Sequence, residues 1–94
     1  MKLVWSAASL RDLSEIAAHI AEDSYRTAEL VETRIDQEAR LLSRFPRSGR
    51  PGRVPGTRER VVRRTPFVLA YRIVSGKVRV LRVYRGARKW PAHL

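Results

Sequence analysis

The sequence predicts an α+β fold: an N-terminal strand, then a two-helix hairpin packed on one face of an antiparallel sheet that a C-terminal three-strand meander completes. Apolar residues recur at helical spacing in the first half of the chain, and β-favouring runs separated by turn signals fill the second half. A meander needs its apolar face covered, and the helices are the elements available to cover it. A chain of 94 residues supports one core, so residues 1–94 are expected to form a single domain.

The N-terminal segment predicts a short strand followed by a helix. The run KLVW from Lys2 to Trp5 is apolar and contains β-favouring residues. Ser9, with Asp12 three positions later, resembles a capping box at a helix start. Apolar residues then recur every three or four positions, which predicts a first helix over residues 10–22.

A second helix is expected directly after the first. Asp23 or Ser24 can cap it, and its apolar stripe continues as far as Leu42. Pro46 prevents the helix from continuing, because proline lacks the amide hydrogen that a helix interior requires. Since only a few residues separate the two helices, we expect them to form a hairpin.

The second half of the chain predicts a loop and three strands. Residues 46–58 contain three prolines and three glycines, a composition typical of turns and extended loop. Strands are predicted over residues 58–64, 67–74 and 77–84, and the middle one is nearly continuously apolar, as expected of a central strand. Ser75-Gly76 is a two-residue hairpin signal.

Charge is unevenly distributed along this basic chain. The net charge is +11, yet residues 1–38 carry four basic against eight acidic side chains, and residues 39–94 carry sixteen basic side chains against Glu59 alone. We therefore expect acidic helices on one side and an arginine-rich sheet face on the other. Such a surface attracts a polyanion or an acidic partner, although a merely solubilising surface would have the same composition.

Several classes of protein are disfavoured. The chain has no cysteine and only two histidines, so neither a metal site nor a cofactor is expected. No phosphate-binding glycine motif and no nucleophile–base pair is evident. The N-terminus lacks a signal-peptide pattern, and no stretch approaches the roughly 20 apolar residues of a membrane span. We expect a cytoplasmic protein with no membrane partner.

Arginine dominates the remaining chemistry. Arginines can bind phosphate bidentately and stabilise the charge of a phosphoryl transition state, so a cluster of them can cleave RNA without a metal. The same residues can hold an acidic protein tail, or form a solvated face with a few salt bridges to the acidic helices. The candidates lie on the predicted strands and in the C-terminal tail: Arg60, Arg63, Arg64, Arg72, Arg79, Arg82, Arg85, Arg88 and Lys89.

Several segments, in their order along the whole chain, resemble the RelE/ParE family of bacterial toxins. They are WSAASLRDL near the start, RSGRPGRVPGTRE over residues 47–59, TPFVLAYR over residues 65–72 and LRVYRGARKWP over residues 81–91. The resemblance implies the toxin of a type II toxin–antitoxin pair, which inhibits bacterial growth and is neutralised by a cognate antitoxin.

The family has two main activities, and the resemblance favours one of them. RelE-like members are ribosome-dependent mRNA endonucleases that use arginines and lysines on the sheet and a late tyrosine. Here Val68 occupies the expected arginine position, Glu59 and Val61 occupy the lysine positions, and only Arg88 matches. The late tyrosine has no counterpart in residues 91–94. This favours ParE-like poisoning of DNA gyrase without a catalytic site.

Two alternatives stay open. The first is a metal-independent endonuclease acting on ribosome-bound mRNA through Arg88 together with Arg63, Arg72 or Arg82. The second is a non-toxic basic module that binds nucleic acid.

The antitoxin is expected to fold on the toxin as a helix or strand, with its acidic groups facing the basic part of the chain. Leu30 and Leu41 lie off the main helical stripe and are candidate contacts, unless they simply widen the face that packs on the core. The other candidate contacts with the antitoxin or target are Arg60, Arg64, Arg79, Arg85, Lys89 and Trp90.

Overall fold

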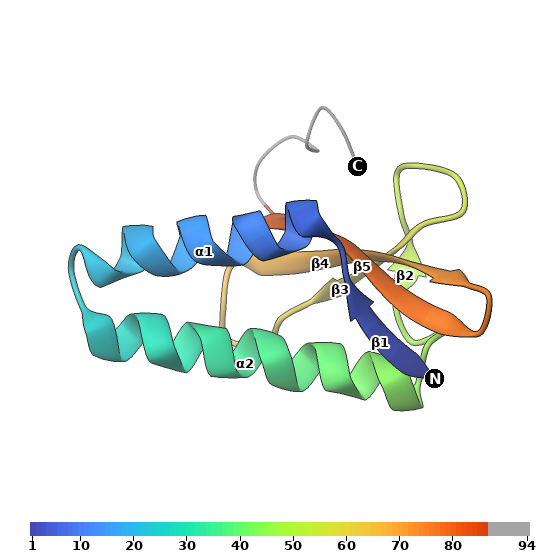
Figure 1. Ribbon diagram of the computed structural model, residues 1–94, viewed down its shortest axis with the longest axis horizontal. Coiled ribbons are helices and arrows are strands. Elements are labelled where there is room, and N and C mark those ends of the chain that lie inside the picture. The colour runs from blue at the N-terminus through green and yellow to red at the C-terminus, as the bar shows by residue number, and fades with distance from the viewer. Residues whose placement is uncertain (87–94) are drawn as a thin grey trace.

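The computed structural model describes residues 1–86 and shows two helices lying on one face of a five-stranded sheet (Figure 1). The strand order is β1-β5-β4-β3-β2, with β1 parallel to β5 and every other neighbouring pair antiparallel. The predicted fold class is confirmed, and the sheet is mixed because the helical hairpin carries the chain from β1 across to the other strands. The elements are β1 (Lys2–Trp5), α1 (Ala7–Ala21), α2 (Tyr25–Arg44), β2 (Arg50–Pro51), β3 (Arg58–Val61), β4 (Phe67–Val74) and β5 (Lys77–Arg85).

Helix α1 begins three residues earlier than predicted. Its N-cap is Ser6, whose backbone is extended and whose hydroxyl accepts a hydrogen bond from the Ser9 amide at 3.0 Å. The prediction of Ser9 as the cap is therefore wrong. Ser9 lies inside the first turn, buried, and donates its own hydroxyl to the Ser6 carbonyl at 2.8 Å.

Helix α2 matches its prediction closely. Ser24 is the N-cap and its hydroxyl accepts from the Thr27 amide at 3.1 Å, which satisfies one of the free donors at a helix start. The helix ends at Arg44, two residues before Pro46. Its buried side chains follow the predicted helical spacing.

The strands differ from prediction in three places. The segment 46–58 was expected to be loop throughout, but it includes β2, which pairs with β3. Strand β3 ends at Val61 because the chain turns there, with Arg64 in the left-handed region at φ 65°. In β5 the register shifts between the partners of Ala70 and Tyr71, so Leu81 is an extra residue in the ladder. The Ser75-Gly76 hairpin is confirmed, with positive φ at both residues.

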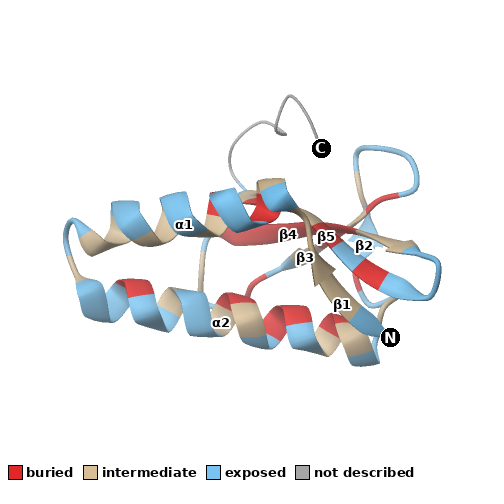
Figure 2. Cartoon of the chain, in the orientation of Figure 1, coloured by how far each residue is buried: buried red, intermediate tan, exposed pale blue. Residues whose placement is uncertain are grey.

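The core lies between the helices and the sheet, as the buried residues in Figure 2 show. Side chains on alternate strand positions face α1 and α2, and the remaining positions form the opposite surface, which we call the outer face. The fully buried side chains include Ile35 and Leu42 from α2 and Leu69 and Tyr71 from β4. Leu3 and Trp5 of β1 pack against this cluster.

Tyr71 fastens the loop after α2 to the core. Its buried hydroxyl donates to the Pro46 carbonyl at 2.7 Å and accepts from the Gly49 amide at 2.9 Å. A Cβ at position 49 would lie 2.5 Å from the Tyr71 oxygen, so only glycine permits this approach. Tyr71 thus fixes the start of β2, together with Arg58, which donates to the Gly49 carbonyl at 2.9 Å.

Helix α1 closes the part of the β5 edge that β1 does not reach. The pairing of β1 with β5 stops at Val80. Beyond it, Ser6 donates its hydroxyl to the Leu81 carbonyl at 2.9 Å, and the Asp12 carboxylate accepts from the Val83 amide at 2.9 Å. Side chains of the helix thus replace the missing strand and satisfy backbone groups that would otherwise be unpaired.

A buried carboxylate connects α2 to β3 and the turn that follows it. Glu38 accepts from Arg60 at 2.7 Å and from Arg63 at 2.9 Å. Burial alone favours the neutral acid, but the hydrogen bonds and positive charges of Arg63 and Arg60 outweigh it, so the pKa of Glu38 lies below its ordinary value.

We expect Tyr71→Phe to destabilise the protein. The substitution keeps the ring but leaves a buried amide and a carbonyl without partners, which costs about 1–3 kcal/mol in the free energy of unfolding. Urea denaturation followed by circular dichroism measures this loss. Tyr25 is 80% exposed, so Tyr25→Phe is the matched control and should change nothing. Equal stabilities for the two variants would contradict the assigned role of Tyr71.

We expect the stability of the protein to fall on acidification in a way that depends on Glu38. A carboxyl whose folded pKa is lowered contributes stability that is complete above its unfolded value, near 4.5, and is lost as the pH falls through the folded pKa. Glu38→Gln should remove this contribution. Thermal unfolding of both proteins between pH 7 and pH 3 should show a smaller midpoint change in the variant. An unchanged pH profile would mean that another carboxylate is responsible.

Candidate functional site

A recess of about 440 Å³ lies between α2 and the turn after β3, where Arg63 and Arg64 are exposed. Two further surfaces of the described structure combine exposed cations with recesses. One is a groove between α1 and the β5 edge, and the other is the outer face of the sheet. Both lie next to β5, whose side chains alternate between the core and the outer face.

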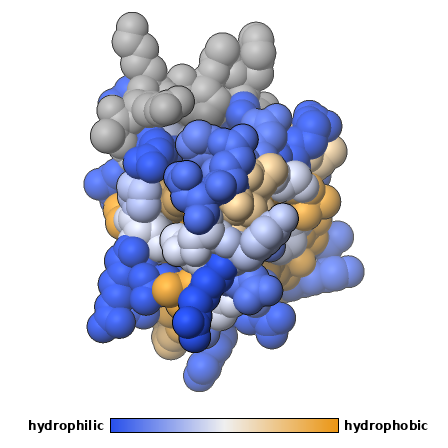
Figure 3. Space-filling model, turned by 90° about the vertical axis from the view of Figure 1, so that its left-hand side faces the viewer, coloured by the Kyte–Doolittle hydropathy of each residue, from blue (hydrophilic) through white to orange (hydrophobic). Residues whose placement is uncertain are grey.

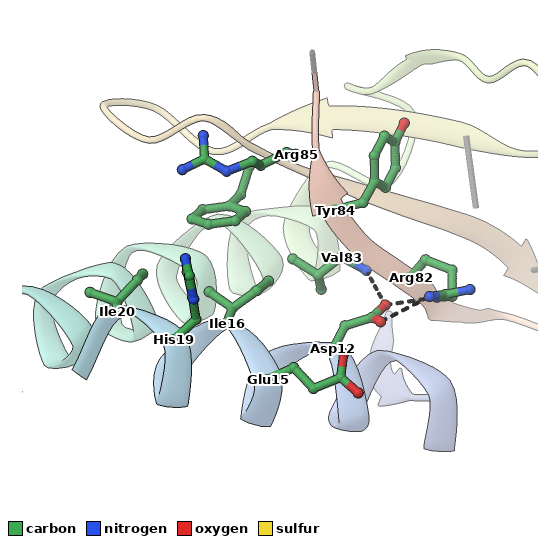
Figure 4. A pocket seen from close by; sticks show the side chains of 10 residues that line it. Asp12, Glu15, Ile16, His19, Ile20, Arg82, Val83, Tyr84 and Arg85 are labelled. Atoms are coloured by element: carbon green, nitrogen blue, oxygen red, sulfur yellow. Dashed lines mark hydrogen bonds and ion pairs between the residues drawn. The ribbon is translucent and has the colours of Figure 1, made fainter. Parts of the chain in front are cut away.

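The groove between α1 and β5 has a volume of about 270 Å³. Figure 4 shows Ile16, His19 and Ile20 of α1 on one side and Arg82 to Arg85 of β5 on the other. Arg85 lies over the Phe67 ring at 5.6 Å from its centroid. The groove therefore combines apolar side chains with an exposed arginine, a combination suited to an amphipathic peptide with acidic groups.

Asp12 and Arg82 form a two-point ion pair at one end of this groove (Figure 4). The distances from the Arg82 nitrogens to the carboxylate oxygens are 2.7 and 2.9 Å, and the hydrogen bond to Asp12 raises the pKa of Arg82. This arginine thus neutralises the carboxylate that closes the strand edge. Its guanidinium is committed to a structural contact.

At its β3 end the outer face is apolar and acidic. The strand register places Val61, Val68 and Tyr84 side by side in one row across β3, β4 and β5. The adjacent row contains Arg50, Glu59, Ala70 and Arg82. Val68 and Ala70 are buried although they lie on the face opposite the helices.

Glu59 organises this end of the outer face. It is buried and accepts from the Arg50 guanidinium at 3.1 Å and from the Arg53 amide at 3.3 Å. Burial, the negative charge of Glu59 and a hydrogen bond with it raise the pKa of Tyr84 to about 12. The phenol is therefore neutral at physiological pH and is a poor general base. A recess of about 270 Å³ lies over these residues.

The four arginines proposed for RNA cleavage do not come together in the described part of the chain. Arg63 pairs with Glu38 on the helix side of the sheet, and Arg82 pairs with Asp12 beside α1. Arg72 lies on the outer face, directly opposite Arg79 across β4 and β5. Arg88 lies outside the described residues. The geometry therefore separates three candidates that the sequence grouped together.

The candidate contacts with the antitoxin or target differ in exposure and in their partners. Leu30 is 49% exposed, so it does not widen the core-facing stripe, whereas Leu41 is partly buried. Figure 3 looks onto the end of the molecule formed by the helical hairpin and shows mostly hydrophilic side chains with smaller hydrophobic areas between them. Arg60 is held by Glu38, and the Arg64 carbonyl accepts from Arg34 at 3.1 Å. Lys89 and Trp90 fall outside the described residues.

Sequence reasoning missed the carboxylates that organise these surfaces. Asp12 was interpreted as part of a capping box, and neither Glu38 nor Glu59 was given a partner. A signal was present for Glu59, because a single acid within a strongly basic segment is a natural ion-pair partner. Within residues 1–86 no group of three or more His, Cys, Asp or Glu side chains is placed to hold a metal ion. No helix in that part of the chain could span a membrane.

Comparison with known proteins places this architecture in a family. Residues 3–90 match the family described as the ParE toxin of the type II toxin–antitoxin system parDE. The putative toxin Y4kP of Sinorhizobium fredii is 39% identical over 90 residues, covering 96% of this chain and 93% of that protein. Toxin RelE2 of Caulobacter vibrioides is 29% identical over 87 residues, covering 93% and 97%.

A solved structure agrees with the sequence comparisons. A chain from the chromosomal ParDE toxin–antitoxin system of P. aeruginosa superimposes with a TM-score of 0.81 at 27% identity, covering 90% of this chain and 95% of that one. The order of elements, the mixed sheet and the helical hairpin are thus those of a known toxin fold. The chain belongs to the RelE/ParE family of type II toxin–antitoxin toxins.

Proposed function

We propose that this toxin inhibits bacterial growth by poisoning DNA gyrase through protein contact, and that a cognate antitoxin neutralises it. The family establishes a toxin of a type II system. The choice of gyrase over RNA rests on the residues at the nuclease positions of RelE-like relatives. Here these positions are Glu59, Val61 and Val68.

The surroundings of these three residues support the proposal. All three lie on the outer face in adjacent rows, so a cation at each would have formed a compact phosphate site. Instead Glu59 is a buried anion, Val68 is 3% exposed and Val61 is apolar. None of the three residues can supply positive charge to RNA at this place, and Glu59 instead engages the nearby Arg50. This single observation weighs most against RNA cleavage.

The arrangement of the remaining arginines agrees with this choice. Arg63 is held by Glu38 on the helix side of the sheet. Arg82 lies on the outer face beside Ala70, but its guanidinium is bound to Asp12 at the β5 edge. An endonuclease would need these cations to converge on one phosphate. A gyrase poison acts in the cytoplasm and needs no such convergence, because its effect comes from binding the target.

The groove between α1 and β5 is the surface best suited to the antitoxin. It is lined by the partly buried Ile16 and Ile20 and by the exposed Arg85. The chain matches a ParDE system in structure, which supports a protein partner of this kind. An antitoxin segment with apolar and acidic residues would bury the isoleucines and pair with the arginine.

We expect the purified toxin to abolish supercoiling by gyrase and to increase the amount of cleaved DNA. Arg88→Ala should retain both effects and should still arrest growth, because the proposed mechanism uses no catalytic arginine. Gel assays of relaxed plasmid with gyrase and ATP measure supercoiling and cleavage together. If supercoiling is unaffected at stoichiometric excess while ribosome-bound transcripts are cut, and Arg88→Ala stops the cutting, the endonuclease alternative is correct.

We expect Arg85→Glu to slow association with the antitoxin encoded beside the toxin gene. Reversing a charge at the rim of an interface acts mainly on the association rate, here by about tenfold at low salt, and the difference should shrink as salt is added. Arg26→Glu on α2 is the matched control, since it makes the same charge change on an exposed helix position away from the groove. Stopped-flow fluorescence measures both rates, and an equal effect of the two variants would exclude the groove.

A further inference from the structure

The end of the outer face near the β4–β5 hairpin carries a group of cations that the proposed function does not use. The register places Lys2 opposite Lys77 and Arg79 opposite Arg72, across β1, β5 and β4. Along each strand, the residues next to these four belong to the core cluster or pack against it. Because successive side chains of a strand point to opposite faces, all four lie on the outer face. We call these four residues the basic ladder.

The basic ladder is unfavourable for folding. Like charges placed directly opposite one another on neighbouring strands destabilise a sheet. Among residues 1–86 no ion pair involves any of the four, and residues 87–94 contain no acidic side chain. The Nε atom of Arg72 is buried without a hydrogen-bond partner in the described structure. The fold therefore leaves this donor unused.

The rest of the molecule shows that these cations could have been neutralised. Arg60 and Arg63 share Glu38, Arg82 has Asp12, and Arg50 has Glu59. Apart from Glu59, every acidic side chain lies on α1, α2 or the turn that joins them, on the other side of the sheet. On the outer face, the ladder is therefore the group of cations that has no acidic side chain as a partner among the described residues.

We propose that the basic ladder binds the sugar-phosphate backbone of duplex DNA. A protein partner is disfavoured, because centres of protein interfaces are enriched in aromatic residues and depleted of charge. In the two rows that hold the ladder, the other paired residues are Val4 and Val74, and neither is aromatic. A single strand is disfavoured as well, because such sites stack bases on aromatic rings. Tyr84, the aromatic residue of the outer face in the described chain, is engaged with Glu59 at the other end. Phosphate contacts alone suit a surface of this composition.

This contact would deepen the proposed action on gyrase, and to that extent it rests on the proposed function. Gyrase holds duplex DNA while it acts, so a toxin that touches both the enzyme and its DNA would stabilise their complex. The binding to DNA itself does not require gyrase. The two ideas can therefore fail separately.

The test measures binding of the full-length chain to a fluorescent 20-base-pair duplex by anisotropy over a range of salt concentrations. Log affinity falls as log salt rises, and we expect Lys77→Gln/Arg79→Gln to make this slope less steep by about 2 units, since each lost phosphate contact removes about one unit. The affinity at low salt should fall by at least tenfold. Arg11→Gln/Arg26→Gln removes the same charge from exposed positions on α1 and α2, and it should change the affinity by less than threefold.

A second measurement separates loss of binding from loss of structure. Because Lys77→Gln/Arg79→Gln relieves repulsion between opposed cations, its thermal midpoint should equal or exceed that of the wild type. A stable variant that binds duplex poorly supports the proposal. An equal loss of affinity in Lys77→Gln/Arg79→Gln and in Arg11→Gln/Arg26→Gln would overturn the proposal. Tighter binding of a single strand than of the duplex would overturn it as well.

The supercoiling assay then distinguishes the two ideas. If wild-type toxin binds the duplex with the expected dependence on the ladder but leaves gyrase unaffected, the proposed function fails and the DNA contact stands. If toxin inhibits gyrase and the ladder variant binds duplex as the wild type does, the DNA contact fails and the proposed function stands.

Discussion

The free edge of β5 is the constraint on which the fold depends. Strand β1 pairs with β5 only as far as Val80, so the backbone beyond that point needs partners from elsewhere. Ser6 and Asp12 supply them, and Arg82 returns to the Asp12 carboxylate with two hydrogen bonds. Breaking such a partly buried pair costs much more than the pair contributes by itself, because the remaining group is left unpaired. The contact therefore fixes α1 against the sheet and with it the helical hairpin.

Carboxylates on the helix side also determine which arginines are free. Asp12 and Glu38 hold three arginines, and Glu59 holds a fourth on the outer face. The remaining cations are concentrated where acidic residues are scarce, because nearly all the acids are in the helical half of the chain. The uneven charge seen along the sequence thus becomes a difference between the two faces of one sheet.

Local signals predicted the elements well, and contacts between distant segments escaped them. The apolar spacing located α2, and the Ser75-Gly76 pair located the hairpin, because both depend on neighbouring residues. Ser6 was missed as a cap because apolar periodicity does not choose between nearby serines. Strand β2 has only two residues, and its contacts with Tyr71, Arg58 and Glu59 come from residues farther along the chain. Arg63 and Arg82 could not be recognised as paired because their carboxylates lie 25 and 70 positions away.

The two ends of the outer face differ in their chemistry. Catalysis of RNA cleavage needs several cations held around one phosphate, and Glu59, Val61 and Val68 supply none at the positions where the family resemblance expects them. Those residues instead form a packed patch, in which Glu59 is neutralised by Arg50 and Val68 is buried. Binding to a charged backbone needs no such convergence, because each cation contributes nearly independently. The hairpin end of the sheet, where cations are spread over three strands, meets the requirement of such binding without meeting that of catalysis.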